Sequence, residues 1–298
     1  MSRPGPSGRA APVVATVAVV VAVVMAGCAD PAPPALGPTL PAAAALPAAA
    51  TTTTTPPPTT PAQPPPRLRV LLSDDDGYDA GGIRAVRAAL TRAGHEVVEV
   101  APEDNRSGAG ADTSGEDDLQ GTDDPGVRTV AGTPADAVLA GLSALRAAGT
   151  PPDLVVSGTN LGRNTGGGIT ESGTVGAAVT AAHAGVPAIA VSTDRARDEA
   201  DCGPTAAFVA RLVGTLATTR PPLPSGLVLN VNHPRSRASG IAWLPTAAIR
   251  LDGDRMHLDG DSDGSDGGLG RGRATLAELH VDGSTPAPIR DRLAGLAP

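Results

Sequence analysis

The chain has 298 residues with a formal net charge of −8, and it contains no lysine. An acidic chain without a basic cluster is a poor binder of nucleic acid polymers, because affinity for their backbone comes from neutralising phosphates. Aromatic residues make up only 1% of the sequence, so a core must be built from Val, Leu, Ile and Ala. If such a protein acts on an anion, it needs a cation or focused N–H groups at that point.

The first 28 residues match the pattern of a lipoprotein signal peptide. Arg3 and Arg9 precede an uncharged apolar run over 13–24, which is too short to span a bilayer comfortably. Ala26-Gly27-Cys28 follows and resembles the lipobox of bacterial lipoproteins, in which Cys28 is the residue that is acylated. We therefore expect export and attachment to the outer face of the cell membrane through lipid on Cys28, or secretion if Cys28 is not acylated.

Residues 29–66 have a composition that cannot form a core. They consist mostly of Pro, Ala and Thr, and Asp30 is their single charged residue. Segments of this kind are disordered and favour extended, polyproline-like conformations. The sequence therefore predicts a disordered linker over 29–66, followed by one globular domain over 67–298.

Within 67–298, short apolar runs alternate with segments of helical spacing. The apolar runs predict strands over 67–73, 96–101, 127–131, 153–157, 188–192 and 227–232. Helical patterns begin at Gly82, Pro134, Thr174 and Thr205. This succession predicts a three-layer α/β fold with a mainly parallel sheet, in which ligands bind at the carboxyl ends of the strands.

Three consecutive carboxylates, Asp74, Asp75 and Asp76, follow the first predicted strand and precede Gly77. They repel one another at the mouth of a buried strand, and a hard divalent cation with oxygen ligands would relieve that repulsion. Acidic runs are usually solvated faces. The position of this run, between an apolar strand and a glycine, favours a site instead.

A candidate anion site follows the predicted strand at 153–157. The chain runs through Asn160 and Asn164 to Ser172-Gly173-Thr174, where a helix is predicted to begin. Glycine, hydroxyl groups and N–H groups at a helix N-terminus bind anions. A metal site and an anion site would then lie side by side, as a phosphomonoesterase requires.

Five blocks of residues carry a family resemblance. They are Leu71–Gly77, Ala101–Gly108, Gly132–Asp136, Val155–Asn160 and Ser172–Ala178. In this order and at this spacing they resemble the SurE family of 5′/3′-nucleotidases (survival protein E). The resemblance runs from about 69 to 192, with a weaker echo at 229–232. It implies a Rossmann-like fold, a dimer or larger assembly, and a phosphatase that uses Mg²⁺ or Mn²⁺ to hydrolyse nucleoside monophosphates.

The resemblance also implies a role for individual residues. The metal ligands of the family fall on Asp75, Asp76, Ser107 and Asn160. The residues on the phosphate side fall on Asn164, Ser172, Gly173 and Thr174. In this interpretation the metal binds a phosphate oxygen and a water, and a carboxylate of the Asp75/Asp76 pair orients or deprotonates that water.

The chain departs from the family pattern at several positions. Asp74 replaces the usual asparagine and adds negative charge beside the metal. Residues 165–168 stand where the family has Gly-Asp-Asp, and Glu171 stands where it has tyrosine. These differences, with the poorly matched segment 109–126, concern substrate preference more than the reaction. The C-terminal third lacks a clear version of the family's dimerisation arm, so the sequence leaves a homodimer open.

Three other interpretations compete with this one. A haloacid-dehalogenase-like phosphatase would use Asp74 as nucleophile, but Tyr78 is not the residue expected there and no lysine is available for its later motif. A non-catalytic, lipid-anchored module could bind nucleotide or metal in the same pocket. Residues 259–264 open like an EF-hand loop, but Gly270 stands at position twelve instead of glutamate, which favours a flexible acidic loop.

Overall fold

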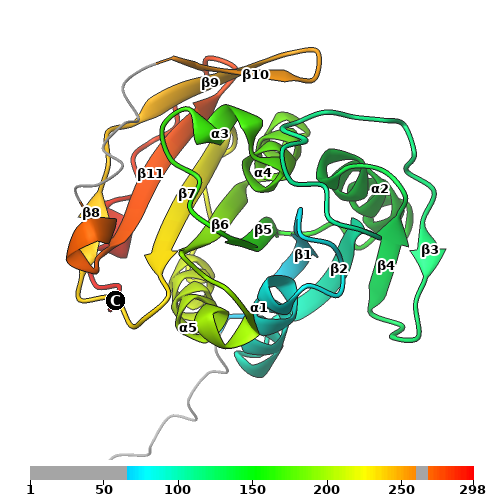
Figure 1. Ribbon diagram of the computed structural model, residues 1–298. Helices are drawn as coiled ribbons and strands as arrows, with labels where there is room; N and C mark the ends of the chain where they lie inside the picture. Colours follow the sequence, from blue (N-terminus) through cyan, green and yellow to red (C-terminus); the bar gives the residue numbers. More distant parts are fainter. Residues whose placement is uncertain (1–65, 260–267) are drawn as a thin grey trace, which may run out of the picture. The chain divides into compact units, whose positions relative to one another are not determined.

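The structure is a computed structural model that describes residues 66–259 and 268–298 (Figure 1). The predicted signal peptide with Cys28, the predicted linker up to residue 65, and residues 260–267 of the EF-hand-like segment lie outside this part. Among the helices that the structure describes, none combines the length and the apolar character that a membrane crossing requires.

The centre of the fold is a run of six parallel strands. They are β1 (Arg69–Ser73), β2 (Glu96–Pro102), β4 (Val127–Val130), β5 (Leu154–Leu161), β6 (Ala188–Asp194) and β7 (Leu227–Pro234). Their spatial order is β7-β6-β5-β1-β2-β4, and every neighbouring pair in it is parallel. Because parallel strands point the same way, the loops after β1, β2, β5, β6 and β7 all lie at the carboxyl ends of the strands, on one side of the sheet.

Helices cover both faces of this sheet (Figure 1). One face packs against α1 (Gly81–Arg92) and α5 (Glu199–Leu216), and the other packs against α2 (Pro134–Ala147) and α4 (Gly173–His183). Side chains alternate between the two cores, as the pleat requires: Val70 and Leu72 of β1 enter the first core, whereas Leu71 enters the second. The predicted three-layer α/β fold with a mainly parallel sheet is confirmed.

Helix capping fixes where two of these helices begin. The Thr133 side chain accepts a hydrogen bond from the Asp136 backbone N–H, and the Asp136 side chain accepts one from the Thr133 N–H, so the predicted start of α2 is correct. The predicted start of α5 at Thr205 is six residues too late. Asp198 caps this helix through the backbone N–H of Asp201, and the helix continues through Pro204.

The C-terminal third extends the sheet, although the sequence analysis assigned it no elements after 232. It contributes β8 (Ile241–Trp243), β9 (Ala247–Asp252), β10 (Arg255–Asp259) and β11 (Ala274–Val281). β11 pairs antiparallel with β7, and the β9–β10 hairpin continues that edge. A two-residue strand, β3 (Gln120–Gly121), closes the opposite edge. β8 has only three residues, and β9 and β10 carry arginine, histidine or aspartate among their apolar residues, which explains their weak sequence signal.

Candidate metal and phosphate site

The loop after β1 holds the three aspartates close together. Ligand oxygens of Asp74, Asp75 and Asp76 all lie within 4.8 Å of one another. Asp74 and Asp75 are 0% and 2% exposed, whereas Asp76 is half-buried. The alternative of a solvated acidic face is therefore wrong for Asp74 and Asp75, because their carboxylates lie inside the protein.

Burial works against the charge on these carboxylates. It raises the pKa of Asp74 well above its ordinary value, and the neighbouring charges of Asp75 and Asp76 act in the same direction. The pKa of Asp75 is also raised, chiefly by burial, against the opposing effect of a hydrogen bond from Thr174. A cation bound among these oxygens would reverse both effects, since it would compensate the buried negative charge.

The loop after β2 and the last residue of β5 hold Asp76 through N–H donors. Asn105 donates from Nδ2 to Asp76 Oδ1 at 2.9 Å, and the backbone N–H of Leu161 donates to Asp76 Oδ2 at 3.0 Å. Ser107 lies on the same loop as Asn105, and its backbone N–H bonds Asn105 Oδ1 at 2.9 Å. Asn160 precedes Leu161, and its side chain donates to the Gly162 carbonyl at 2.9 Å. The structure thus brings the loop with Ser107 and the end of β5 with Asn160, the two predicted neutral ligands, next to Asp76.

The N-terminus of α4 lies directly against Asp75. Thr174 Oγ1 donates to Asp75 Oδ1 at 2.7 Å, and Ser172 caps the helix by accepting from the Val175 N–H at 3.1 Å. A Cβ at Gly173 would stand 2.8 Å from Asp75 Cβ and 3.1 Å from Asp75 Oδ2, so only glycine fits there. This contact joins the acidic cluster to a helix end that presents N–H groups.

Asn164, predicted on the phosphate side, is 8% exposed and already hydrogen-bonded within the protein. Its Nδ2 donates to Ser192 Oγ at 2.9 Å and to Thr174 Oγ1 at 3.4 Å. Its backbone bonds the side chains of Asn230 and Asn232 on β7. Asn164 therefore lies between Thr174 and the polar side chains of β6 and β7.

The cluster fits a metal ion by its donor set and by one atom without a partner. All of its ligand atoms are carboxylate oxygens, which suit hard divalent cations. Asp74 Oδ2 is buried and has no hydrogen-bond partner among the described residues, whereas Asp74 Oδ1 accepts from the Asp75 N–H at 2.9 Å. A buried carboxylate oxygen without a partner among the described residues is suited to bind an ion.

Four residues that support the site were not predicted from the sequence. Asn105 lies in the loop after β2, within the family block Ala101–Gly108, and Ser192, Asn230 and Asn232 lie on β6 and β7. The pattern Asn-Val-Asn in an otherwise apolar strand was the available signal, because buried amides must find partners. Their partner is a loop more than sixty residues earlier, which no local pattern identifies.

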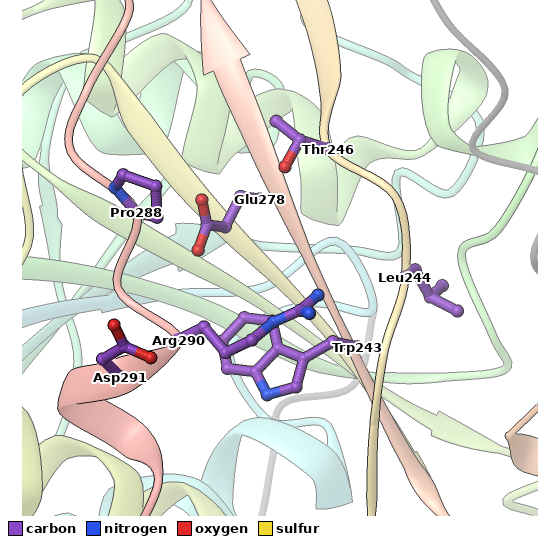
Figure 2. A pocket seen from close by; sticks show the side chains of 7 residues that line it. All are labelled: Trp243, Leu244, Thr246, Glu278, Pro288, Arg290 and Asp291. Atoms are coloured by element: carbon purple, nitrogen blue, oxygen red, sulfur yellow. The ribbon is translucent and has the colours of Figure 1, made fainter.

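Another cavity, of about 240 Å³, lies between β8, β11 and the C-terminal segment (Figure 2). Arg290 is placed over the ring of Trp243, with its guanidinium carbon 5.1 Å from the ring centroid. Glu278 is 5% exposed and accepts a hydrogen bond from the Ile289 N–H at 3.0 Å. None of the predicted site residues lines this cavity, so it is separate from the acidic cluster.

Comparison with known proteins identifies the family of the chain. The family model described as Survival protein SurE matches residues 70–251, which is more than half of the chain. The chain belongs to the SurE family. The residues proposed for the site, from Asp74 to Thr174, all lie inside the matched span, and the family resemblance seen in the sequence is confirmed.

Individual SurE proteins show how far the similarity extends. The 5′-nucleotidase SurE of Xanthomonas campestris pv. campestris (strain B100) is 43% identical over 194 residues, covering 62% of this chain and 68% of that protein. The 5′-nucleotidase SurE of Gloeobacter violaceus is 42% identical over 199 residues, covering 64% and 73%. The crystal structure of the SurE protein from Aquifex aeolicus superposes with a TM-score of 0.60 at 30% identity, covering 73% of this chain and 95% of that one.

Proposed function

We propose that this SurE protein is a phosphomonoesterase that hydrolyses nucleoside 5′-monophosphates, with 3′-monophosphates as further substrates, and that it requires Mg²⁺ or Mn²⁺. The observation that carries the proposal is the 2.7 Å hydrogen bond from Thr174 to Asp75, because it places a helix N-terminus suited to phosphate against an acidic cluster suited to a metal. The names of the similar SurE proteins supply the substrate class.

In this proposal Asp75 and Asp76, with Ser107 and Asn160, hold the metal. A divalent ion bound there supplies a Lewis acid for a phosphate oxygen and lowers the pKa of a water. The N-terminus of α4, with Ser172, Gly173 and Thr174 and with Asn164 behind them, binds the remaining phosphate oxygens. A carboxylate of the Asp75/Asp76 pair accepts a proton as the water oxygen bonds phosphorus. The ester P–O bond breaks, and the leaving oxygen takes up a proton to give the nucleoside.

Two other functions use the same residues differently. A phosphoaspartate mechanism on Asp74 is disfavoured by its surroundings, because Asp74 is 0% exposed and its Oδ1 is bonded to the Asp75 N–H. A non-catalytic module that binds nucleotide or metal is supported by the family departures at 165–168 and Glu171. Turnover separates this second function from the nucleotidase.

The test is phosphate release by the purified chain from a panel of 5′- and 3′-nucleotides, with Mg²⁺, Mn²⁺ or EDTA. Asp75→Asn removes a charged metal ligand, and we expect it to lower the rate by about a thousandfold or more. Asp79→Asn is the matched control, since Asp79 lies four residues away, is exposed and pairs with Arg84 at 2.5 Å. Its rate should stay within about twofold of the wild type.

The outcomes separate the alternatives. Activity that resists EDTA, or that survives in Asp75→Asn, would exclude the metal mechanism. A folded wild-type chain that binds Mn²⁺ but releases no phosphate from any nucleotide would establish the binding module instead.

The proposal extends to attachment and assembly. Lipid on Cys28 would hold the enzyme at the outer face of the bacterial cell membrane, and the same enzyme would assemble as a homodimer. Mass spectrometry of the mature N-terminus and globomycin treatment of expressing cells test the lipid, and an unmodified Cys28 would exclude the anchor. Sedimentation of the purified chain tests the dimer.

A further inference from the structure

Two buried amides on β7 lie close to the site without belonging to it. Asn230 and Asn232 are two residues apart on one strand, so their side chains leave the same face, and each is 1% exposed. The rest of the strand up to Val231 is Leu or Val, which suits its position between β6 and β11. Amides at such positions cost free energy unless they are hydrogen-bonded, so the bonds that they make deserve an explanation.

Both amides bond the backbone of one residue, Asn164. Asn230 Nδ2 and Asn232 Nδ2 donate to the Asn164 carbonyl at 3.0 and 3.1 Å. Asn232 Oδ1 accepts from the Asn164 N–H at 2.8 Å. Asn164 lies in the loop between β5 and α3 (Gly168–Glu171), outside any helix or strand. The two β7 side chains therefore supply the partners that a sheet ladder would otherwise give this buried backbone.

Asn164 is linked to Asp75 by two successive hydrogen bonds through the Thr174 hydroxyl. Asn164 Nδ2 donates to Ser192 Oγ at 2.9 Å and, in the longest contact of the series, to Thr174 Oγ1 at 3.4 Å. Thr174 Oγ1 in turn donates to Asp75 Oδ1 at 2.7 Å. A hydroxyl carries one hydrogen, and an amide NH₂ group can only donate. Asn164 thus makes Thr174 an acceptor on one side and leaves its hydrogen for Asp75.

We propose that Asn230 and Asn232 are positioning residues of the site: by fixing the Asn164 backbone, they orient Thr174, and Thr174 orients the Asp75 carboxylate for the metal. The inference rests on the proposed metal role of Asp75. All members of the series are at most 8% exposed, so water does not compete for these bonds and a change at β7 is transmitted to Asp75. Residues that orient metal ligands in this way typically change metal affinity by tenfold to a hundredfold when they are lost.

The test measures Mn²⁺ binding by calorimetry on the metal-free full chain, beside kcat and KM for a 5′-nucleotide. Asn232→Ala removes one donor and the only side-chain acceptor for the Asn164 N–H among the described residues, whereas Asn230→Ala removes one donor. We expect Asn232→Ala to weaken Mn²⁺ binding on the order of tenfold or more and to lower kcat with little change in KM. Asn230→Ala should show a smaller weakening in the same direction.

Thr275→Val is the matched control. Thr275 lies opposite Asn232 in the β11–β7 register, is 0% exposed, and its hydroxyl has no hydrogen-bond partner among the described residues. Its loss perturbs the same part of the sheet without touching the series, so its Mn²⁺ dissociation constant should stay within about twofold of the wild type. Thermal denaturation of every variant shows at which temperature all of them are folded.

The results bear separately on the two proposals. A folded Asn232→Ala chain that binds Mn²⁺ as tightly as the wild type overturns the positioning role, and so does a wild-type chain that binds no Mn²⁺. If Asn232→Ala does not fold, Asn230→Ala decides on the same criterion. A wild-type chain that binds Mn²⁺ but releases no phosphate rejects the nucleotidase alone, because weaker binding in the β7 variants would still support the positioning role.

Discussion

Buried polar side chains at the end of β1 and on β7 are compensated in different ways. Both are parallel strands of one sheet, and both place buried polar side chains toward the carboxyl ends of the strands. After β1 these side chains are carboxylates, and Asp74 Oδ2 is left without a hydrogen-bond partner among the described residues. On β7 they are the amides of Asn230 and Asn232, which make three hydrogen bonds with the Asn164 backbone, although Asn230 Oδ1 has no hydrogen-bond partner in the part of the chain that the structure describes.

This difference indicates which of the two places requires a bound ion to compensate its buried polar groups. An amide both donates and accepts, so two amides and a backbone can satisfy one another. Ionised carboxylates only accept, and three of them repel one another, so no arrangement of the aspartates alone removes the penalty of burying them. The β1 end is therefore suited to a cation, whereas the β7 end is largely completed within the chain.

The largest effect should come from breaking the contact at the β1 end. Gly173→Ala would place a methyl group 2.8 Å from Asp75 Cβ, which forces Asp75 and α4 apart. We expect phosphate release to fall by about a hundredfold or more, since small misplacements at a site have effects of that order. Gly214→Ala on α5 is the control, because no heavy atom lies within 4 Å of its added Cβ. Initial rates of both variants check the prediction, and equal rates would contradict it.

The β7 end should become unstable once it acquires charge. His233, 1% exposed, has its pKa lowered from 6.5 to about 4, chiefly by burial. The folded chain thus keeps His233 neutral while the unfolded chain takes up a proton below about pH 6.5, so stability falls as pH drops from 6.5 to 4. The loss attributable to His233 is at most about 3 kcal/mol.

Replacing His233 by glutamine should remove that share of the acid sensitivity. Urea unfolding of the wild type and His233→Gln at several pH values between 7 and 4 measures it. The glutamine variant should lose less stability over this range. Parallel curves for the two proteins would show that His233 does not titrate as its burial implies.

A smaller effect should come from making the β1 end resemble the β7 end. Asp74→Asn keeps the acceptor for the Asp75 N–H and removes one of the crowded charges. We expect the metal-free chain to gain about 1–2 kcal/mol of unfolding free energy, and the further gain on adding Mn²⁺ to shrink. Thermal denaturation in EDTA and in Mn²⁺ measures both quantities. A metal-free variant no more stable than the wild type would mean that the charge of Asp74 is already compensated.

Much of the fold was predictable because it depends on local patterns. The strand over 188–192 and the capped helix at Thr133 were found from apolar runs and from a capping signal, and both elements exist. The acidic loop was found because three carboxylates after an apolar strand are unusual. The hairpin of β9 and β10 was missed because charged and polar residues interrupt its apolar residues and because β9 pairs with β11, which lies further along the chain.

The sequence by itself determined the alternation of strands and helices, the acidic cluster and the family, since each depends only on neighbouring residues or on blocks of residues in a fixed order. Only the tertiary structure decided that Thr174 bonds Asp75, that Gly173 leaves no room for a side chain, and that β7 holds Asn164. These contacts join residues between 66 and 99 positions apart. Hydrogen-bond partners at that separation are set by strand order and register, which emerge only when the sheet assembles.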